Sequence, residues 1–269
     1  TPAPKECMEL STFYKILTEI RSVYTPLELN DISFATYNEP NLDVGFKEKL
    51  MLMTSMGFQY EHISNGSMIT TDLTDFLIQY PQNIKQFRLN IPTLDESKWK
   101  DITGSAVNVL YRMFYQLEYL FSRASLLNFP ITVIVNGDGG EDHKMEFQKV
   151  YQKFAHYKGI NLSMTGLIDR AGTLEGAECE TQKLPSGEID WGDQPLQCNA
   201  SYFDNLYFGI KGNVFYCCHD YHQEYSCGNI HETPLKDLLN SDSYHKQKQR
   251  FMHDFCRKCE QARPLQTVN

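Results

Sequence analysis

The chain has 269 residues, of which 41% are hydrophobic and 22% are charged, and its formal net charge is −9. This acidic balance, without a run of basic residues, excludes nonspecific binding to nucleic acid or anionic membranes, because contacts with phosphate groups need lysine and arginine. No segment approaches the roughly 18 consecutive apolar residues of a membrane span, and residues 1–20 lack the pattern of a secretory signal. We therefore expect a cytoplasmic protein with neither a nucleic-acid partner nor a membrane partner.

Helical and strand patterns alternate between residues 10 and 170. Apolar residues recur at three- and four-residue spacing in the helical segments, which are 10–23, 45–56, 71–80, 106–121 and 141–157. The short apolar segments typical of strands are 31–36, 59–63, 84–91, 131–135 and 161–167. This alternation predicts an α/β fold with a parallel sheet. The glycine-rich segment 136–142 lacks the residues of a phosphate or calcium loop and is interpreted as a plain strand-to-helix turn.

The pattern changes near residue 175, where a second and smaller domain begins. Two short strands, 206–210 and 214–216, flank Lys211-Gly-Asn213, which is a hairpin turn signal. Short helical segments follow at 234–240 and at 244–251. We therefore predict two domains, one over residues 1–175 and one over residues 176–269.

Four cysteines of the second domain have the spacing of a metal site. Cys198 precedes Gly212 by fourteen positions, Cys217 follows that glycine after four intervening residues, and Cys256-x2-Cys259 comes last. Thiolates select zinc or iron–sulfur clusters, and four sulfurs satisfy either a tetrahedral zinc ion or a [4Fe-4S] cube. The spacing alone leaves both metals open.

The amino-acid sequence of this region resembles that of the Twitch module, the shortened form of the SPASM domain found in radical S-adenosylmethionine enzymes. The resemblance lies in Gly212-Asn-Val-Phe-Tyr-Cys217 and in the segment from Gly228 to Leu238. It implies that Cys198, Cys217, Cys256 and Cys259 bind an auxiliary [4Fe-4S] cluster. It also implies a partial (β/α)6 barrel, with its first strand missing from this sequence, followed by a small C-terminal Twitch domain.

The upstream strand ends resemble the same family. Segment 32–40, which ends in Glu39-Pro40, resembles the strand whose edge binds the amino group of S-adenosylmethionine, although Tyr37-Asn38 replaces the usual glycine pair. Segment 167–172 resembles the sixth strand of the family, which implies that Arg170 either reaches the mouth of the barrel or forms a structural ion pair with Asp169 or Glu39. The resemblance implies that S-adenosylmethionine is bound by Asn38, Glu39, Ser64, Asn65 and Asn90.

The implied chemistry is radical-based. A relative of this kind cleaves S-adenosylmethionine to a 5'-deoxyadenosyl radical, abstracts hydrogen from its substrate and receives electrons from a reducing partner such as flavodoxin or ferredoxin. The sequence resembles that of the aminocyclitol dehydrogenases of the family. This resemblance implies oxidation of a polar small molecule with the auxiliary cluster as electron acceptor. Arg170 and Cys218 are the candidate catalytic residues, Arg170 as a substrate or cofactor clamp and Cys218 as a hydrogen donor.

The family's radical-generating cluster is bound by Cys-x3-Cys-x2-Cys, and residues 1–269 contain no such triplet. Segment 4–17 resembles the helix that follows the triplet, so the resemblance implies that the triplet, and with it a second [4Fe-4S] cluster, lies before residue 1. A degenerate relative without radical chemistry is the alternative. We favour the first interpretation because a barrel that lacks its first strand leaves an open sheet edge.

Two other functions remain open. Maturation of a ribosomally made peptide, by epimerisation or crosslinking, would use the same cofactors with a peptide substrate. A non-enzymatic degenerate barrel stabilised by zinc would use the four cysteines for structure alone. His219 and His222, which follow the Cys217-Cys218 pair, are expected to form hydrogen bonds rather than to bind metal.

Overall fold

A computed structural model describes residues 6–25, 32–34, 39–166, 196–198, 205–215, 217–220, 223–249, 256–257, 259 and 261–264. The chain divides into two compact units. We call residues 26–166 the sheet unit, and residues 1–25 together with 167–269 the cysteine unit. Among the described residues, no helix is long and apolar enough to cross a membrane.

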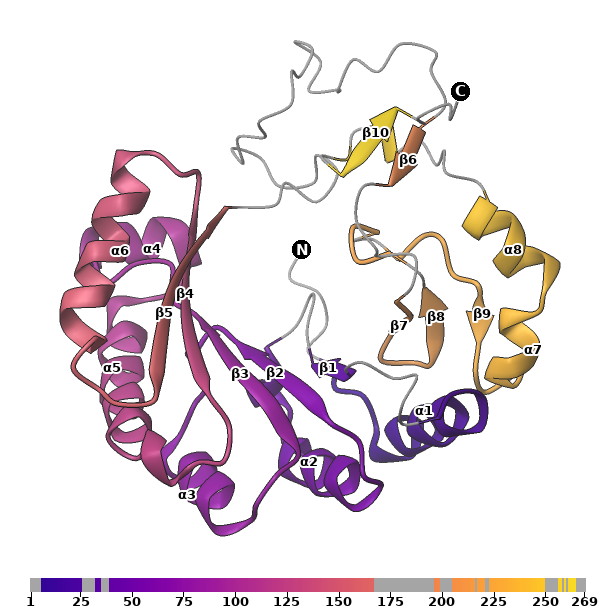
Figure 1. The fold of residues 1–269 in the computed structure, drawn as a ribbon, viewed down its shortest axis with the longest axis horizontal. Helices are drawn as coiled ribbons and strands as arrows, with labels where there is room; N and C mark the ends of the chain where they lie inside the picture. The colour runs from indigo at the N-terminus through magenta and orange to yellow at the C-terminus, as the bar shows by residue number, and fades with distance from the viewer. Residues whose placement is uncertain are drawn as a thin grey trace. The chain divides into compact units, whose positions relative to one another are not determined.

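The sheet unit contains a parallel sheet whose strands stand side by side in chain order (Figure 1). The strands are β1 (Ile32–Phe34), β2 (Tyr60–Ser64), β3 (Ile84–Asn90), β4 (Ile131–Gly137) and β5 (Ile160–Gly166). The helices are α2 (Phe46–Ser55), α3 (Thr71–Gln79), α4 (Glu96–Thr103), α5 (Val107–Ser122) and α6 (Glu141–Phe154). This order confirms the predicted α/β class and the partial barrel. The predicted turn at 136–142 is also confirmed, because β4 ends and α6 begins within it.

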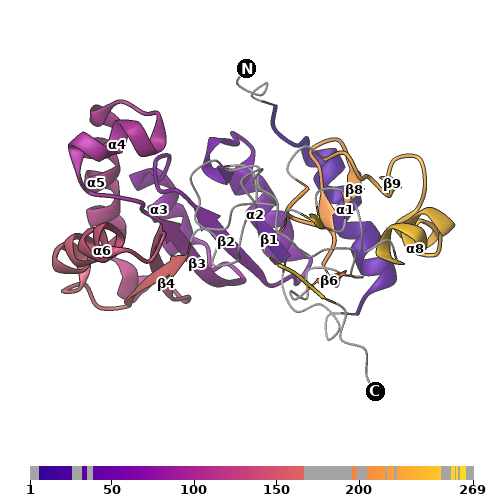
Figure 2. The ribbon, with the colours of Figure 1, turned by 90° about the horizontal axis from the view of Figure 1, so that it is seen from above.

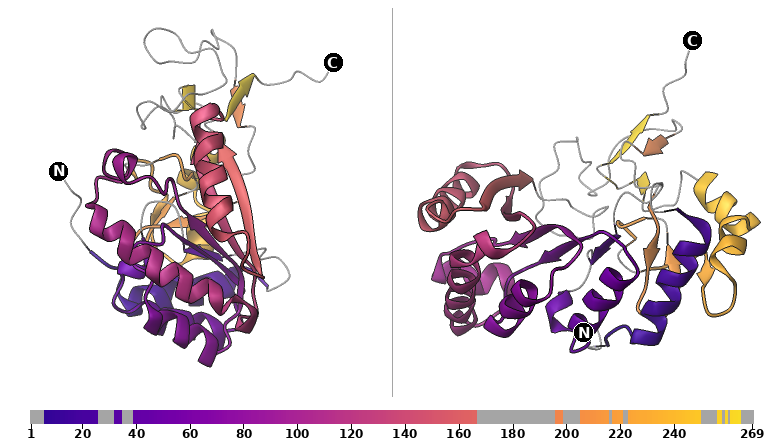
Figure 3. Two further views of the ribbon diagram at one scale, coloured as in Figure 1. Left: turned by 90° about the vertical axis from the view of Figure 1, so that its left-hand side faces the viewer. Right: turned by 60° about the horizontal axis from the view of Figure 1, so that its bottom comes forward.

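The two faces of the sheet differ because successive side chains of a strand point to opposite faces. Helices α2 to α6 cover one face, as Figures 1 and 3 show from several sides. On that face lie the fully buried side chains of Phe87, Leu89, Ile131 and Val133. This layer between strands and helices is the hydrophobic core of the sheet unit.

The other face of the sheet carries polar groups that bond across the strands. Arg88 donates from Nη2 to Oε1 of Glu61 at 3.0 Å and from Nε to Oε1 of Gln86 at 3.1 Å. Gln86 in turn donates to the hydroxyl of Thr132 at 2.7 Å. These bonds connect β2, β3 and β4. The face without helices is therefore polar and lined with hydrogen-bonding groups.

The cysteine unit combines α1 (Leu10–Val23) with the C-terminal part of the chain, and Figure 2 shows it from above. Its other elements are β6 (Leu196–Cys198), β7 (Tyr207–Phe208), β8 (Asn213–Phe215), β9 (Gly228–Asn229), α7 (Leu235–Leu239), α8 (Asp242–Gln249) and β10 (Ala262–Pro264). Strands β7, β8 and β9 form an antiparallel sheet, and β6 pairs with β10. The predicted hairpin is confirmed, since Gly212 has φ +82° in the turn between β7 and β8.

Helix α1 is held in the cysteine unit by polar contacts. Glu19 accepts a hydrogen bond from the backbone N–H of Leu235, the first residue of α7, at 2.8 Å, and Thr12 contacts Nε2 of His231 at 3.2 Å. Lys15 pairs with Glu19 at 2.8 Å. The N-terminal helix therefore packs with the C-terminal segment. The predicted domain boundary at residue 175 lies outside the described residues.

Candidate functional sites

Strand pairing brings Cys198 close to the last two candidate ligands. Cys198 ends β6, and its Cα pairs with that of Ala262 in β10. Ala262 donates its backbone N–H to the carbonyl of Cys259 at 3.1 Å, and Cys259 donates to the carbonyl of Cys256 at 3.1 Å. The pairing of β6 with β10 therefore holds Cys198 beside the turn that contains Cys256 and Cys259.

Hydrogen-bond donors surround the sulfur atoms of Cys217 and Cys259. The backbone N–H of His219 donates to Sγ of Cys217 at 3.4 Å, and the backbone N–H of Gln261 donates to Sγ of Cys259 at 3.4 Å. Nδ1 of the His219 ring lies 3.9 Å from the same Sγ of Cys259. His219 therefore contacts sulfur atoms from two distant parts of the chain.

The thiol of Cys217 is buried, and burial is the main cause that raises its pKa to about 12. The amide of His219 opposes this rise in the pKa, whereas the nearby groups of Cys218 and Cys256 add to it. Metal binding requires the thiolate, so a bound metal would displace this proton. Among the described residues, no three His, Cys, Asp or Glu side chains converge closely enough to hold a single metal ion. Soft sulfur donors with N–H groups directed at them fit an iron–sulfur cluster.

The remaining cysteines occupy different environments. Cys218 is half-buried next to Cys217, and Cys7 is exposed. Cys227 is buried against Tyr244, with Cys217 packed on the same cluster, and burial raises the pKa of Cys227 to about 11. The packing of Cys227 is that of a small apolar residue.

A second candidate site lies at the carboxyl ends of the first strands of the sheet unit. The carboxylate of Glu39 accepts hydrogen bonds from the Ser64 hydroxyl at 2.8 Å, from the backbone N–H of Asn41 at 3.2 Å and from that of Asn65 at 2.7 Å. Ser64 ends β2 and also accepts a bond from the Asn41 side chain at 2.8 Å. Glu39 is thus fixed by the end of β2 and by the short turn of Pro40–Leu42 that directly follows Glu39.

The electrostatics of this site favour a positively charged ligand group. Burial raises the pKa of Glu39, and the hydrogen bonds from Asn65, Ser64 and Asn41 oppose this rise only in part. In the part of the chain that the structure describes, Glu39 has no cationic partner. Oδ1 of Asn41 and Oδ1 of Asn90 are likewise buried without a hydrogen-bond partner among those residues. Such acceptors fit an ammonium group, which would favour the ionised form of Glu39.

The predicted binding residues are brought together in part. Ser64 lies opposite Leu89 in the register of β2 and β3, so Asn65 and Asn90 follow on neighbouring strands. Asn41 was missed by sequence reasoning, although its place two residues after Glu39 and directly after Pro40 could have indicated a turn that contacts the carboxylate. Two further predicted site residues, Asn38 and Arg170, lie outside the described residues.

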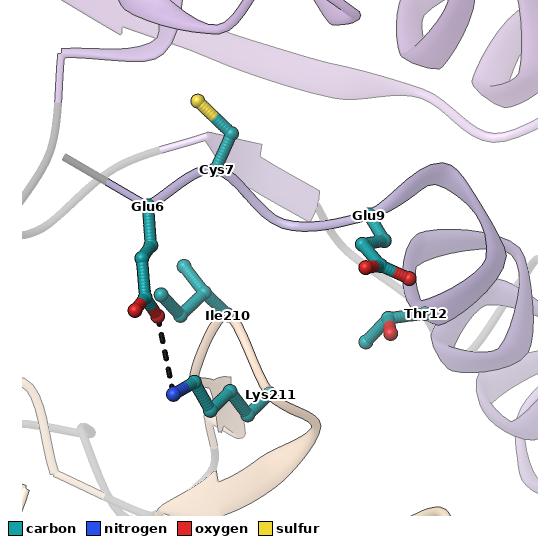
Figure 4. A pocket seen from close by; sticks show the side chains of 6 residues that line it. All are labelled: Glu6, Cys7, Glu9, Thr12, Ile210 and Lys211. Atoms are coloured by element: carbon teal, nitrogen blue, oxygen red, sulfur yellow. Dashed lines mark ion pairs between the residues drawn. The ribbon is translucent and has the colours of Figure 1, made fainter.

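A pocket of about 380 Å³ lies elsewhere in the cysteine unit. Its lining residues come from the start of the chain and from the β7–β8 turn; they are Glu6, Cys7, Glu9, Thr12, Ile210 and Lys211. Figure 4 shows that Lys211 and Glu6 approach each other, with an ion pair of 3.1 Å, and that the side chain of Cys7 points away from both. None of the predicted site residues lines this pocket.

Comparison with known proteins supports the assignment of the cysteine unit. Residues 198–260 match the family model of SPASM, an iron-sulfur cluster-binding domain. This match spans all four predicted cluster cysteines. No curated protein matches the sequence.

Three solved structures are similar to this chain. SuiB of Streptococcus suis, bound to the precursor peptide SuiA, has a TM-score of 0.58 and 11% identity over 93% of this chain and 64% of its own. The protein anSMEcpe with bound AdoMet has a TM-score of 0.58 and 13% identity over 95% of this chain and 76% of its own. BtrN in complex with AdoMet and 2-DOIA has a TM-score of 0.49 and 16% identity over 96% of this chain and 81% of its own.

This chain spans less than two thirds of SuiB, at 64%. The chain has the fold of SuiB and anSMEcpe, and its residues 198–260 are similar to the SPASM iron–sulfur cluster-binding domain, which confirms the predicted resemblance to radical S-adenosylmethionine enzymes that carry such a domain.

Proposed function

We propose that this protein is a radical S-adenosylmethionine enzyme of the cytoplasm that oxidises a polar small molecule and uses an auxiliary [4Fe-4S] cluster as electron acceptor. The observation that carries the proposal is the buried Glu39 carboxylate. It lies at the carboxyl ends of a parallel sheet and has no cationic partner among the described residues, in a chain that also contains a SPASM domain. The methionyl ammonium group of S-adenosylmethionine would supply the cationic partner for this carboxylate.

In this proposal Glu39 accepts hydrogen bonds from the methionyl ammonium group. The Ser64 hydroxyl and the backbone N–H of Asn65 hold the carboxylate in place through their hydrogen bonds to Glu39, at 2.8 Å and 2.7 Å. Asn90 supplies a further polar contact from the end of β3, and Asn38, which lies outside the described residues, is the remaining proposed contact. Arg170 binds a carboxylate of cofactor or substrate, because a guanidinium group matches that geometry.

When bound, the cofactor supplies the radical that removes a hydrogen atom from the substrate, and the auxiliary cluster accepts one electron. Oxidation of a secondary alcohol to a ketone balances on this basis: one hydrogen atom, one proton and one electron leave the substrate. Cys198, Cys217, Cys256 and Cys259 hold the cluster through their thiolates. A flavodoxin or ferredoxin would supply the electron for cleavage of the cofactor, and a second [4Fe-4S] cluster would deliver that electron. Residues 1–269 contain no Cys-x3-Cys-x2-Cys motif that would hold this second cluster.

Replacement of Glu39 by glutamine tests this proposal. A charge-assisted hydrogen bond contributes about 1.5–3 kcal/mol, so Glu39→Gln should weaken binding of S-adenosylmethionine by about 10- to 100-fold. Equilibrium dialysis of anaerobically purified protein measures this affinity. Glu48→Gln, at an exposed glutamate of α2, is the matched control and should bind as the wild type does. Equal affinity of the Glu39→Gln variant and the wild type would contradict the proposed site.

Maturation of a peptide is the second candidate function. It is favoured by the likeness of the fold to SuiB, whose structure contains a precursor peptide. In that case Cys218, half-buried beside Cys217, would donate a hydrogen atom to a peptide radical. Deuterium incorporated from solvent into a peptide product, and lost in Cys218→Ala, would favour this function over oxidation of a small molecule. Zinc rather than iron in the purified protein would contradict both.

A further inference from the structure

His219 is a buried polar residue to which the proposed chemistry gives no role. Its side chain is 3% exposed, and Cys259, which its ring contacts, is 7% exposed. The sulfur atoms of Cys217 and Cys259 are approached by the backbone amides of His219, Asp220 and Gln261 and by Nδ1 of the His219 ring. Only the ring of His219 is a side-chain group, so substitution can remove it without altering the backbone.

We propose that His219 donates a hydrogen bond from Nδ1 to the Sγ of Cys259 and thereby raises the reduction potential of the auxiliary cluster. This inference rests on the proposed function, because it presupposes that Cys259 is a cluster ligand. The 3.9 Å separation of Nδ1 from Sγ, together with the bond of the His219 amide to Cys217, places one residue against two ligand sulfurs. His219 is a positioning residue, since it acts through the ligands.

The direction of the effect follows from charge. Reduction adds one electron to the cluster, and part of the added negative charge lies on the ligand sulfurs. An N–H donor stabilises that charge, so the reduced form gains more than the oxidised form and the potential rises. Burial strengthens the effect, because a hydrogen bond is electrostatically stronger where water is excluded.

Two substitutions at His219 distinguish a role as hydrogen-bond donor from a role in filling space. In asparagine, Nδ2 occupies nearly the position of Nδ1 in histidine, so His219→Asn retains a donor near Sγ of Cys259. His219→Leu removes the donor and retains most of the volume. His231→Leu is the matched control, because His231 belongs to the same unit and contacts Thr12 rather than a cysteine.

The experiment is a redox titration of the anaerobic, cluster-loaded chain, followed by electron paramagnetic resonance. At one solution potential we expect the ratio of reduced to oxidised cluster to be about tenfold lower in His219→Leu, which equals about 59 mV for a one-electron couple. His219→Asn should lie within about twofold of the wild type, and His231→Leu should equal it. Equal potentials in the Leu variant and the wild type, or the same fall in both the Asn and Leu variants, would overturn the inference.

A second measurement needs no variant. Wild-type protein whose histidines carry ¹⁵N only at ring Nδ1 should show a nitrogen coupling from that label and an exchangeable proton coupling in the electron–nuclear double resonance spectrum of the reduced cluster; a label at Nδ1 alone excludes the backbone amide of His219, which also bonds to a cysteine sulfur. A loaded wild type without these couplings overturns the role of His219 and leaves the proposed function intact. A wild type that contains no iron–sulfur cluster contradicts the proposed function itself. Loss of the cluster from all His219 variants would identify His219 as a ligand and also overturn the inference.

Discussion

The most direct physical prediction concerns His62, a histidine of β2 whose ring forms no hydrogen bond with any residue that the structure describes. Its side chain is 2% exposed and lies between two phenylalanine rings, with centroid distances of 4.8 Å to Phe46 and 4.3 Å to Phe87. Neither ring nitrogen has a hydrogen-bond partner among the described residues. Burial alone lowers the pKa of His62 to about 3 from an ordinary value of 6.5.

The burial of the His62 ring determines two quantities: its cost in folding stability at neutral pH and the change of folding stability with pH. A buried polar group without a partner costs about 1–3 kcal/mol of stability, so His62→Leu should stabilise the protein by about that amount at neutral pH. The unfolded chain binds a proton at His62 below pH 6.5, whereas the folded chain does not do so until about pH 3. Stability of the wild type should therefore fall as the pH drops below 6.5, by up to about 1.4 kcal/mol per pH unit from this residue.

Urea unfolding followed by tryptophan fluorescence measures both effects. Trp99 is buried in the sheet unit, and a Trp191→Phe background makes it the only tryptophan. The difference in unfolding free energy between His62→Leu and the parent should widen from pH 6.5 to pH 4.5, because other titrating groups cancel in the comparison.

His143 is the matched control. It is also buried in the sheet unit, but its ring accepts a bond from the Gly139 N–H at 3.0 Å and contacts the Val135 carbonyl at 2.9 Å. His143→Leu should therefore destabilise the protein by about 1–3 kcal/mol, since it leaves two backbone groups unpaired. If His62→Leu destabilised the protein as His143→Leu does, or if its effect did not change with pH, the reasoning about His62 would be refuted.

Two further predictions concern stability and can be measured by thermal unfolding with circular dichroism. Gly212→Ala should cost more than about 2 kcal/mol, because a Cβ there would lie 2.9 Å from side-chain atoms of residues 230–231 and φ is +82°. Gly57→Ala, with φ +73° and open space, should cost only about 1–2 kcal/mol, and equal losses would contradict the steric argument. Glu146→Gln should cost about 1–3 kcal/mol, because the buried carboxylate bonds to Thr93 at 2.7 Å and to two lysines; an unchanged midpoint would contradict it.

The parallel strands and their helices could be predicted because their apolar residues are periodic. Helix α4 was missed for a physical reason: it is short, and its only apolar residues are Trp99 and Ile102, of which only Trp99 is buried, so the apolar period is too brief to recognise. The helix is bounded by the Asp95 cap and by Gly104 in the left-handed conformation. The capping signal was present in the sequence and was not used.

Prediction of the sites was limited by contacts between distant residues. The cysteine spacing indicated a metal site, and the resemblance of two short segments to strand ends of the family indicated Glu39 and Ser64, because such signals are local. The approach of His219 to Cys259 joins residues 40 positions apart and depends on packing that spacing does not encode. The pairing of β6 with β10 likewise joins two three-residue strands, too short to show alternation.

The grouping of α1 with the C-terminal segment has a consequence for the order of assembly during synthesis. The sheet unit is continuous in sequence, whereas the cysteine unit begins before it and is completed only after residue 166. A ribosome makes all of residues 26–166 before it reaches any of the four predicted cluster cysteines. Helix α1 is therefore made long before α7, which it contacts, so its apolar face has no partner from its own unit until the C-terminal segment is made, and any cluster bound by these cysteines can be inserted only after that.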